Sequence, residues 1–558
     1  MLLCLFLYPF ILWAALLIAP CWGGGLLDMI PRLQAALQSP LEISWTEQSA
    51  PSIFVCTGLY ALGLTIYFSS RGRTRDGEEH GSATWGSARE LNRQFAQKQS
   101  KILTRHVRLG LDSRKHRRSL NVLVIGGSGA AKTRSYVLPN ILEANTNYVI
   151  TDPKSEVLLA TGSYLKSKGY EIRVLNLVNL SESDGYNSFC YLRDEKDALK
   201  LVNNLIQATT PKGAQSSDPF WEKSETALLQ AIILMLMEEA PLEEQNFSMV
   251  VRTLEYATVD ENDDSVTSPL DILFESLERR QPESVAVRQY KVFKQAADKT
   301  AKSILVSAAV RLAAFNLPQV KTITNHDDMD LYSLGEQKVA LYAVIPDNDN
   351  SFSFLVSLLY SQVFQALYYS ADQIHHGALP CHVHLVLDEF AAMPLPGFTR
   401  ELATMRSRNI SASTIIQNMA QIKSLYKDDW ETIPGNSDSI LYLGGNEAST
   451  HKYISEMLGK STIDLKTHGE SKGRSGSYST NYQMAGRELL TPDEVRKLDN
   501  RYAILFIRGA KPVMDQKYDL MKHPAIRQTS LGGGTPYIHH STPALRGQQL
   551  FLPAGTRG

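Results

Sequence analysis

NVLVIGGSGAAKT, at residues 121–133, decides the fold class of this chain. The first five residues are mostly apolar and β-branched, which predicts a buried strand, and the residues after Lys132-Thr133 are typical of a helix. Strand, glycine-rich loop, Lys-Thr and helix in this order form the pattern of a phosphate-binding loop, or P-loop. The stretch therefore predicts an α/β domain with a nucleotide site at the end of its first core strand.

Each part of this loop has a role in binding phosphate. Glycines allow successive backbone N–H groups to point inward, and the helix N-terminus adds positive potential. Lys132 is expected to reach the β- and γ-phosphates, and Thr133 to hold Mg²⁺. We therefore predict ATP and Mg²⁺ as cofactors; a glycine-rich turn without nucleotide is the alternative. The predicted nucleotide-binding residues are Gly126, Gly127, Ser128, Gly129, Ala130, Ala131, Lys132 and Thr133.

Ala131 stands where this motif usually has a glycine. An alanine fits if its φ is negative, whereas a positive φ would bring strain or weaker nucleotide binding. Because Ala131 directly precedes Lys132 at the expected start of a helix, the sequence predicts a negative φ.

A second motif, VHLVLDEF at residues 383–390, is an apolar strand that ends in two acids. This pattern is typical of a Walker B element. Asp388 is expected to bind the Mg²⁺ shell, and Glu389 to orient and deprotonate the attacking water. Two acids after a strand can also cap a helix, which is the alternative reading.

The next strand, SASTII at 411–416, is followed by Gln417, from which an amide can contact both the attacking water and the γ-phosphate. Upstream, Arg406 and Arg408 lie on an expected helix. One of them could project across a subunit boundary as an arginine finger. For both arginines, a solvated helix face is the alternative.

The N-terminal part of the chain is predicted to enter a membrane. The first 27 residues carry no charge, and a second charge-free run covers residues 52–70 and is followed by Arg71, Arg73 and Arg75. Runs of this length are typical of membrane-spanning helices, and the arginines mark a cytoplasmic flank. The sequence therefore predicts a hairpin with spans at about 1–22 and 52–70 and an outer loop between them. A secretory signal peptide or a buried hydrophobic hairpin is the alternative.

The rest of the chain is predicted to be a cytoplasmic body with a parallel sheet. Apolar strands that alternate with helices are typical of such a core. Residues 193–297 have helical periodicity and no clear strand, which predicts an all-α insertion. The predicted strands are 121–125, 148–151, 171–176, 339–344, 384–388, 411–416, 440–444 and 502–507.

These patterns predict five segments. They are a transmembrane hairpin (1–75), a nucleotide-binding domain in two parts (76–192 and 298–527), the all-α insertion (193–297) and a flexible tail (528–558). Within the second part, residues 466–486 are polar and rich in Gly and Ser, which predicts a mobile loop.

Composition limits the classes of partner and metal site. With 43% hydrophobic residues and a net charge of −1, the chain is an ordinary folded protein without a global basic field. The stretch at 101–120 concentrates Lys and Arg, and could meet DNA phosphates, anionic lipid or only solvent.

The cysteines and histidines do not indicate a metal site. The five cysteines lack a CxxC spacing. His375, His376, His382 and His384 straddle a loop and a strand edge, so we interpret them as structural rather than as metal ligands.

The order and the residues of these motifs resemble those of the type IV coupling proteins, the TraG/TraD group of conjugative ATPases, especially forms from Gram-positive bacteria and their integrative elements. The resemblance covers nearly the whole chain. It rests on the two N-terminal apolar runs and on HGSATWGSAREL, NVLVIGGSGAAKTR, VITDPKSEVL, SDPFWEKSETALLQA, KSILVSAAVRLAAFN, LYAVIPDNDNSFSFLVSLLYSQVFQAL, LVLDEFAAMP, TIIQNMAQI and IPGNSDSILYLGG.

The resemblance implies a RecA-like P-loop domain with an all-α insertion, six copies in a ring, and nucleotide between neighbours. It also implies Lys132, Glu389, Gln417 and Arg406 as catalytic residues and Thr133 and Asp388 as metal ligands. Its implied partners are a relaxase bound to single-stranded DNA, the type IV secretion channel subunits and ATPases, and the membrane. The role of Asp152-Pro153-Lys154 stays open, because Ser155 replaces the glycine that the group has there.

The sequence thus predicts an ATP-driven coupling protein in the cell membrane. Two other classes remain open at this point. One is a non-hydrolysing docking receptor, suggested by Ala131, and the other is a double-stranded DNA translocase, which would share the ring and the P-loop.

Overall fold

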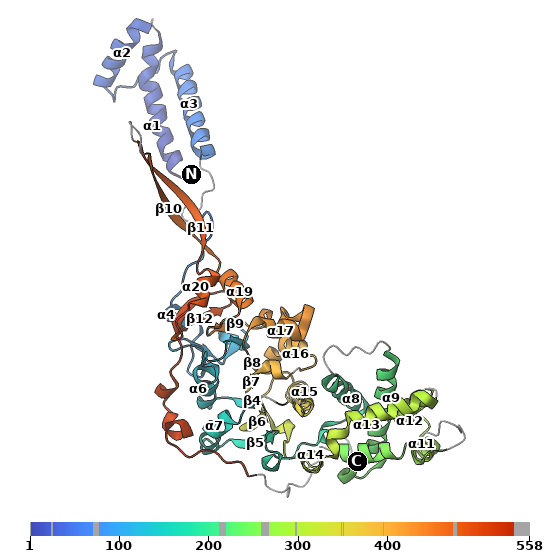
Figure 1. Cartoon of the computed structure of the whole chain (residues 1–558). Helices are drawn as coiled ribbons and strands as arrows, with labels where there is room; N and C mark the ends of the chain where they lie inside the picture. Colours follow the sequence, from blue (N-terminus) through green and yellow to red (C-terminus); the bar gives the residue numbers. More distant parts are fainter. Residues whose placement is uncertain are drawn as a thin grey trace. The chain divides into compact units, whose positions relative to one another are not determined.

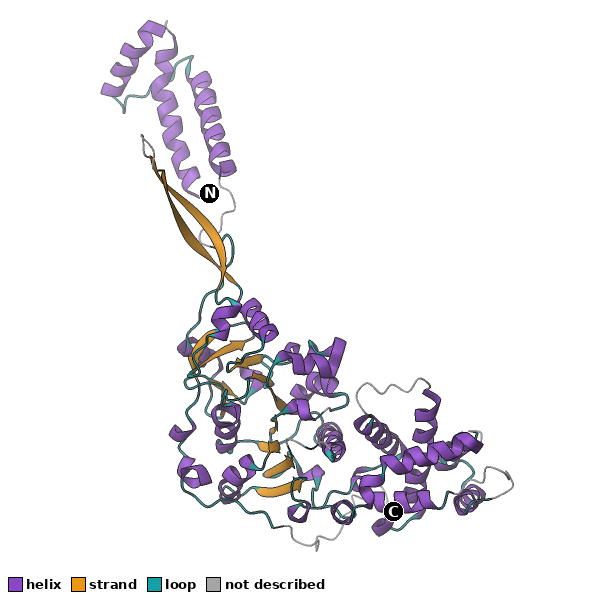
Figure 2. Ribbon diagram, in the orientation of Figure 1, coloured by secondary structure: helices purple, strands orange, loops and turns teal. Residues whose placement is uncertain are grey.

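The computed structural model describes residues 2–23, 26–70, 78–210, 219–257, 267–295, 298–346, 349, 351–393, 395–471 and 477–540 (Figures 1 and 2). The chain divides into two compact units. The first consists of Met1–Ser82 with Ser461–Arg487, and the second of Ala83–Lys460 with Glu488–Gly558.

Three α-helices make up the N-terminal part of the first unit: α1 (Leu2–Ile18), α2 (Leu26–Gln38) and α3 (Ser49–Ser70). Helices α1 and α3 pack against each other, and the Ser52 hydroxyl donates a hydrogen bond of 2.7 Å to the Ala15 carbonyl. Among the described residues, only Ser49–Ser69 is both long and apolar enough to cross a membrane. Helix α1 has 17 residues, at the short end of what a span needs.

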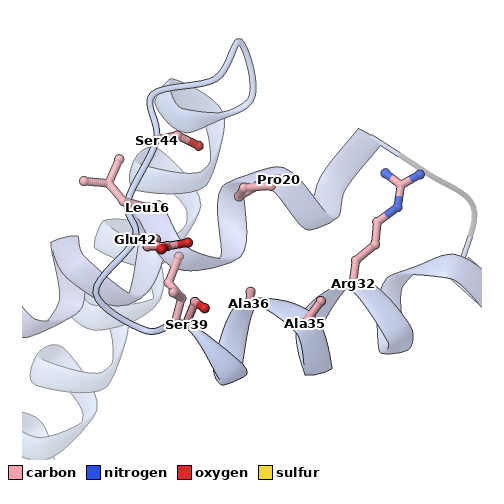
Figure 3. Close-up of a pocket in the computed structure, with 9 residues that line it drawn as sticks. Leu16, Pro20, Arg32, Ala35, Ala36, Ser39, Glu42 and Ser44 are labelled. Carbon is pink, nitrogen blue, oxygen red and sulfur yellow. The ribbon is translucent and has the colours of Figure 1, made fainter.

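The segment expected as an outer loop contains helix α2. It lies beside the C-terminal end of α1, and a cavity of about 470 Å³ opens between them. Figure 3 shows Glu42 and Ser39 at one end of this cavity and Arg32 at the other.

The segment predicted as a mobile loop at 466–486 forms a two-stranded ribbon of β10 (Lys460–Ser471) and β11 (Ser477–Glu488). Because five residues separate the strands, they can pair only as an antiparallel hairpin. The mobile-loop prediction is therefore wrong for the strand residues, and residues 472–476 lie outside the described part of the chain.

A nine-stranded sheet forms the centre of the second unit, in the order β13-β12-β9-β3-β8-β7-β4-β6-β5. The seven strands from β9 to β5 run parallel, while β12 and β13 are antiparallel to their neighbours. The sequence predicts eight of the nine strands close to their observed places, but it misses β13 and treats the sheet as parallel. The strands are β3 (Val122–Ile125), β4 (Asn147–Pro153), β5 (Glu171–Asn176), β6 (Val339–Ile345), β7 (Val383–Leu387), β8 (Ile410–Ile416), β9 (Ser439–Tyr442), β12 (Tyr502–Ile507) and β13 (Val513–Gln516).

Helices cover both faces of this sheet, so it has two hydrophobic cores (Figure 1). Successive side chains of a strand point to opposite faces. In β3, Leu123 and Ile125 belong to one core, and Val122 and Val124 to the other. The first core includes α15 (Ser353–Tyr369), α16 (Phe398–Thr404), α17 (Met419–Tyr426) and α19 (Ala448–Leu458), and the second α4 (Ala88–Phe95), α6 (Leu138–Leu142) and α7 (Glu156–Ser167).

The described residues between β5 and β6 contain helices and no strand. The α-helices are α8 (Glu195–Thr209), α9 (Pro219–Glu239), α10 (Phe247–Glu255), α11 (Pro269–Arg280), α12 (Val285–Lys294), α13 (Asp298–Arg311) and α14 (Pro318–Thr324). The predicted all-α insertion ends at residue 297, before α13 and α14, so the boundaries of the insertion stay a proposal.

The basic stretch after the first unit forms a small hairpin of β1 (Ser100–Ile102) and β2 (Arg108–Gly110), followed by α5 (Ser113–His116). Lys101 is buried, and its ammonium donates to the Leu120 carbonyl and the Ser411 hydroxyl. This lysine therefore has a structural role and cannot meet DNA or lipid phosphates.

Residues 528–540, which the sequence predicts as part of a flexible tail, pack against other residues of the second unit. The His539 ring bonds Asp184 at 2.8 Å, and Tyr537 lies against Gly162 of α7. Residues 541–558 lie outside the described part. Short helices α18 (Thr432–Gly435) and α20 (Pro492–Arg496) complete the unit.

Candidate functional site

The P-loop is held against two neighbouring strands at the carboxyl edge of the sheet. The Gly126 N–H donates to the Ile416 carbonyl at 3.0 Å, and the Gly127 N–H to the Gly444 carbonyl at 2.8 Å. A Cβ on Gly127 would lie 3.1 Å from the Gly445 Cα, closer than side chains normally approach a backbone. A side chain at 127 would therefore require the backbone at Gly445 to move by a few tenths of an ångström. Sequence reasoning does not predict this contact for Gly444 and Gly445, although a Gly-Gly pair after a strand is a signal of such an approach.

Ala131 has a φ of +63°, so the prediction of a negative φ is wrong. The N–H and hydroxyl of Ser135 both donate to the Ala131 carbonyl, at 2.8 and 2.7 Å, while Lys132 already has right-handed helical dihedrals. Ala131 thus flanks the first helical turn and is not part of it. The chain must bend there from the loop into the helix, and the left-handed conformation makes this bend at a cost of about 1–2 kcal/mol for a residue with a Cβ.

The Walker B acids meet the Lys-Thr pair across more than 250 residues of sequence. The Thr133 hydroxyl donates to Asp388 Oδ2 at 3.0 Å, and Lys132 Nζ lies 3.7 Å from Glu389 Oε1. Strand β7 and strand β3 are separated only by β8, and in a parallel sheet the ends of all three point to one edge. The structure therefore brings Lys132, Thr133, Asp388 and Glu389 together.

Gln417 joins the same group. Its side-chain amide donates to Glu389 Oε2 at 3.0 Å, so each oxygen of the Glu389 carboxylate faces a different element of the site. Glu389 itself has a φ of +48°, and its N–H donates to Asp388 Oδ1 at 3.0 Å. Glu389 thus has a left-handed conformation two residues after the end of β7, and the two neighbouring carboxylates face different partners. Such strain is frequent at functional sites.

Two buried carboxyl groups at this edge have raised pKa values. Burial is the main cause for Asp388, with the Glu389 charge adding to it, and the pKa is about 6. Burial likewise raises the pKa of Asp152 to about 7, although hydrogen bonds from the Leu158 and Val157 N–H groups oppose the rise. Each group would hold its negative charge more readily beside a bound cation.

Asp152, whose role the sequence leaves open, anchors the start of helix α7. Its two oxygens accept from the N–H groups of Val157 and Leu158, at 3.1 and 2.7 Å. Between the strand and the helix, Lys154 and Ser155 have φ values of +72° and +60°. Ser155 thus adopts a glycine-like conformation at the position where a glycine is expected.

Arg408 and Arg406 have different surroundings. The Arg408 guanidinium forms two hydrogen bonds to the Asp372 carboxylate, at 2.9 and 2.8 Å, and stacks on the Tyr368 ring. Arg406 is exposed, and within the described part of the chain it has no hydrogen bond or ion pair. Both lie on the 3₁₀ turn η10 (Met405–Arg408), before the amino end of β8 and therefore at the edge of the sheet opposite the P-loop. The structure does not bring Arg406 to the site of its own chain.

The predicted structural histidines of the Walker B strand form hydrogen bonds inside the protein. The His384 ring bonds the Ser413 hydroxyl at 2.7 Å, and Tyr136, which follows the P-loop, bonds the same hydroxyl. His382 bonds Ser411 and Asn409. Burial lowers the pKa of His382 to about 3 and that of His384 well below its usual value, so both rings are neutral.

Comparison with known proteins agrees with this arrangement. The family model described as "Type IV secretory system Conjugative DNA transfer" matches residues 79–529. The conjugal transfer protein TraG of Agrobacterium fabrum is 22% identical over 508 residues, which cover 83% of this chain and 74% of that protein. TraG of Rhizobium radiobacter is 23% identical over 406 residues, 70% of this chain. The chain spans about 60% of that relative's length.

A solved structure has the same fold. The plasmid coupling protein TrwB in complex with the ATP analogue ADPNP superposes with a TM-score of 0.57 at 17% identity, covering 78% of this chain and 93% of that one. TrwB in complex with ADP and Mg²⁺ gives a TM-score of 0.56. At this identity the likeness establishes the architecture, an α/β P-loop domain with an all-α part, and not the activity.

Proposed function

Because this chain belongs to the family of type IV secretory system conjugative DNA transfer proteins, we propose that it is a membrane-anchored P-loop ATPase of the coupling protein type. In this proposal it recruits relaxase-bound single-stranded DNA, or protein substrates, and uses ATP hydrolysis to deliver them to a type IV secretion channel.

One observation carries the ATPase proposal. The Thr133 hydroxyl and the Asp388 carboxylate lie 3.0 Å apart, although 255 residues separate them in sequence. A hydroxyl and a carboxylate at this separation, next to a glycine loop and a buried lysine, are the oxygen ligands and the cation that a nucleotide with Mg²⁺ requires. A glycine turn with a structural role would need neither the lysine nor the acid.

The other residues then take separate roles. The N–H groups of Gly126, Gly127 and Ala130 bond to backbone carbonyls, so the N–H groups of Ser128, Gly129, Ala131 and Lys132 would face the phosphates. The Lys132 ammonium would leave Glu389 and bind the β- and γ-phosphate oxygens instead. Glu389, released from Lys132 and still bonded to Gln417 at 3.0 Å, is placed to accept a proton from water. Gln417 fixes the orientation of that carboxylate. Mg²⁺ bound at Thr133 and Asp388 would supply charge neutralisation on the transferred phosphoryl group.

Arg406 fits a role in a neighbouring subunit. It is exposed and lies at the edge of the sheet opposite its own P-loop, so it can reach a nucleotide only if that nucleotide belongs to another copy. This supports nucleotide binding between subunits of a ring, and we propose a homohexamer. Arg408 is occupied by Asp372 and is not a candidate.

The membrane anchor is proposed to be a two-span hairpin. Helix α3 has the length and composition of a span, and α1, which packs along it, continues through the 3₁₀ turn η1 (Ala19–Gly23) as an apolar segment. The arginines at 71, 73 and 75 support a cytoplasmic body under the positive-inside rule.

Turnover of ATP by the detergent-extracted full chain tests the proposal. We expect hydrolysis that single-stranded DNA stimulates more than duplex DNA does, and loss of hydrolysis in Lys132→Ala, which removes the charge on the phosphates. Lys452→Ala, which removes an exposed lysine of α19 that pairs with Glu456, is the matched control. Binding without hydrolysis by the unmodified chain would favour a docking receptor, and a preference for duplex DNA would favour a double-stranded DNA translocase.

A further inference from the structure

Lys517 contacts the P-loop from a distant part of the sequence. It follows strand β13 at the far edge of the sheet, and its ammonium donates to the Ala130 carbonyl at 3.0 Å. The same ammonium donates to the Asn500 side-chain oxygen at 2.7 Å. The peptide to which it is bonded is the one that joins Ala130 to Ala131.

This peptide is also the one whose orientation depends on φ of Ala131. Rotation about the N–Cα bond of Ala131 turns the Ala130 carbonyl and the Ala131 N–H together, because the peptide is planar. At the observed φ of +63° the plane has the orientation that glycine adopts freely and alanine resists. A rotation to negative φ would move the Ala130 oxygen away from Lys517 and break the hydrogen bond.

The lysine remains charged at neutral pH, which makes this bond a strong one. Burial lowers the pKa of Lys517 to about 8, while the nearby Asp499 opposes the shift. Hydrogen bonds from an ammonium to a carbonyl are stronger than neutral ones. In a trans peptide the N–H points opposite to the carbonyl, so the bond also directs the Ala131 N–H away from Lys517.

We propose that Lys517 is a positioning residue for the P-loop, which holds the Ala130–Ala131 peptide in its phosphate-binding orientation and so compensates for the alanine at position 131. The inference rests on the proposed nucleotide site. It explains how the loop keeps a glycine-like conformation without the glycine. It also assigns a role in nucleotide binding to a residue outside the P-loop and Walker B motifs.

A double-mutant cycle tests the proposal with a fluorescent ATP analogue. Lys517→Met keeps an unbranched side chain, one atom shorter, and removes the charged donor, while Ala131→Gly removes the strain that the lysine is inferred to offset. We expect Lys517→Met to weaken binding about tenfold in the natural background and twofold or less beside Ala131→Gly. Lys517→Arg should retain most of the affinity. Lys522→Met, an exposed lysine in the same segment, is the control and should change binding little.

Thermal unfolding of the same variants without nucleotide separates positioning from a general loss of stability. Equal losses of affinity in both backgrounds, or no loss in the natural background, would overturn the role of Lys517 and leave the ATPase proposal intact. If the unmodified chain binds no nucleotide at all, the proposed site fails, and the inference fails with it.

Discussion

Replacing Glu389 with Gln separates ATP binding from hydrolysis. In the structure one oxygen of this carboxylate lies 3.7 Å from Lys132 Nζ, and the other accepts from the Gln417 amide at 3.0 Å. Glutamine has the same size, and its carbonyl oxygen can keep the bond to Gln417. It loses only the ion pair with Lys132 and the ability to accept a proton.

The size of each effect follows from these contacts. General base catalysis by a positioned side chain typically contributes about 10²–10⁴-fold, which corresponds to roughly 2.7–5.4 kcal/mol of barrier. The Glu389 side chain is 30% exposed, and a partly solvated ion pair at this distance contributes only about 0–1 kcal/mol. We therefore expect kcat to fall by about two to four orders of magnitude while the nucleotide Kd changes by less than about fivefold.

Phosphate release and titration with a fluorescent ATP analogue measure the two quantities separately. Glu456→Gln, on the exposed face of α19, is the control and should keep both values. The variant should also accumulate with ATP bound, so that assembled rings are trapped. Turnover within about threefold of the unmodified protein would refute the role of Glu389 and require another base.

Three further predictions concern other parts of the chain. Arg406→Ala should reduce turnover at least about tenfold, and mixing it with Lys132→Ala should restore part of the activity if the arginine acts across subunits; no recovery in mixed rings would refute the trans role. A reporter that is active only outside the membrane should be active when fused at Gln38 and silent at Gly77, and the opposite pattern would invert the predicted hairpin. Burial alone would raise the pKa of Glu447, which caps α19, but hydrogen bonds from Ser449 and Thr450 outweigh it and lower the value to about 2. Since this pKa lies below its unfolded value, its stabilisation is present above about pH 4.5 and is lost toward pH 2, so the difference in Tm between the natural chain and Glu447→Gln should shrink over that range.

The sequence predicts the core of the site because strand order does not have to be known for it. Lys132 follows one apolar strand, Asp388 another and Gln417 a third. In a parallel sheet all such ends meet at one edge. A common edge for Lys132, Asp388 and Gln417 is therefore predictable, whereas the 3.0 Å contact between Thr133 and Asp388 also requires that β8 alone separates β3 from β7.

Features that do not depend on apolar pattern could not be predicted in the same way. The sequence of the ribbon β10–β11 is largely polar and lacks the sustained apolar alternation that identifies a buried strand. The antiparallel direction of β12 also cannot be predicted from the sequence, because apolar strands of either direction have the same composition. The φ of Ala131 depends on where the helix begins, and a helix start is uncertain by about one or two residues.

Strand β8 has a place in the sheet that could connect neighbouring sites. Gln417, which is bonded to Glu389, directly follows its carboxyl end, and Arg406 lies four residues before its amino end. Its seven residues extend over roughly 20 Å and are buried throughout, between β3 and β7. A strand that is paired on both sides is a rigid secondary element. If Arg406 contacts the nucleotide of a neighbouring subunit, a shift of β8 that follows a change at Gln417 must also move Arg406. Substitutions within β8 should then alter the cooperativity of ATP hydrolysis, even at positions that contact neither nucleotide.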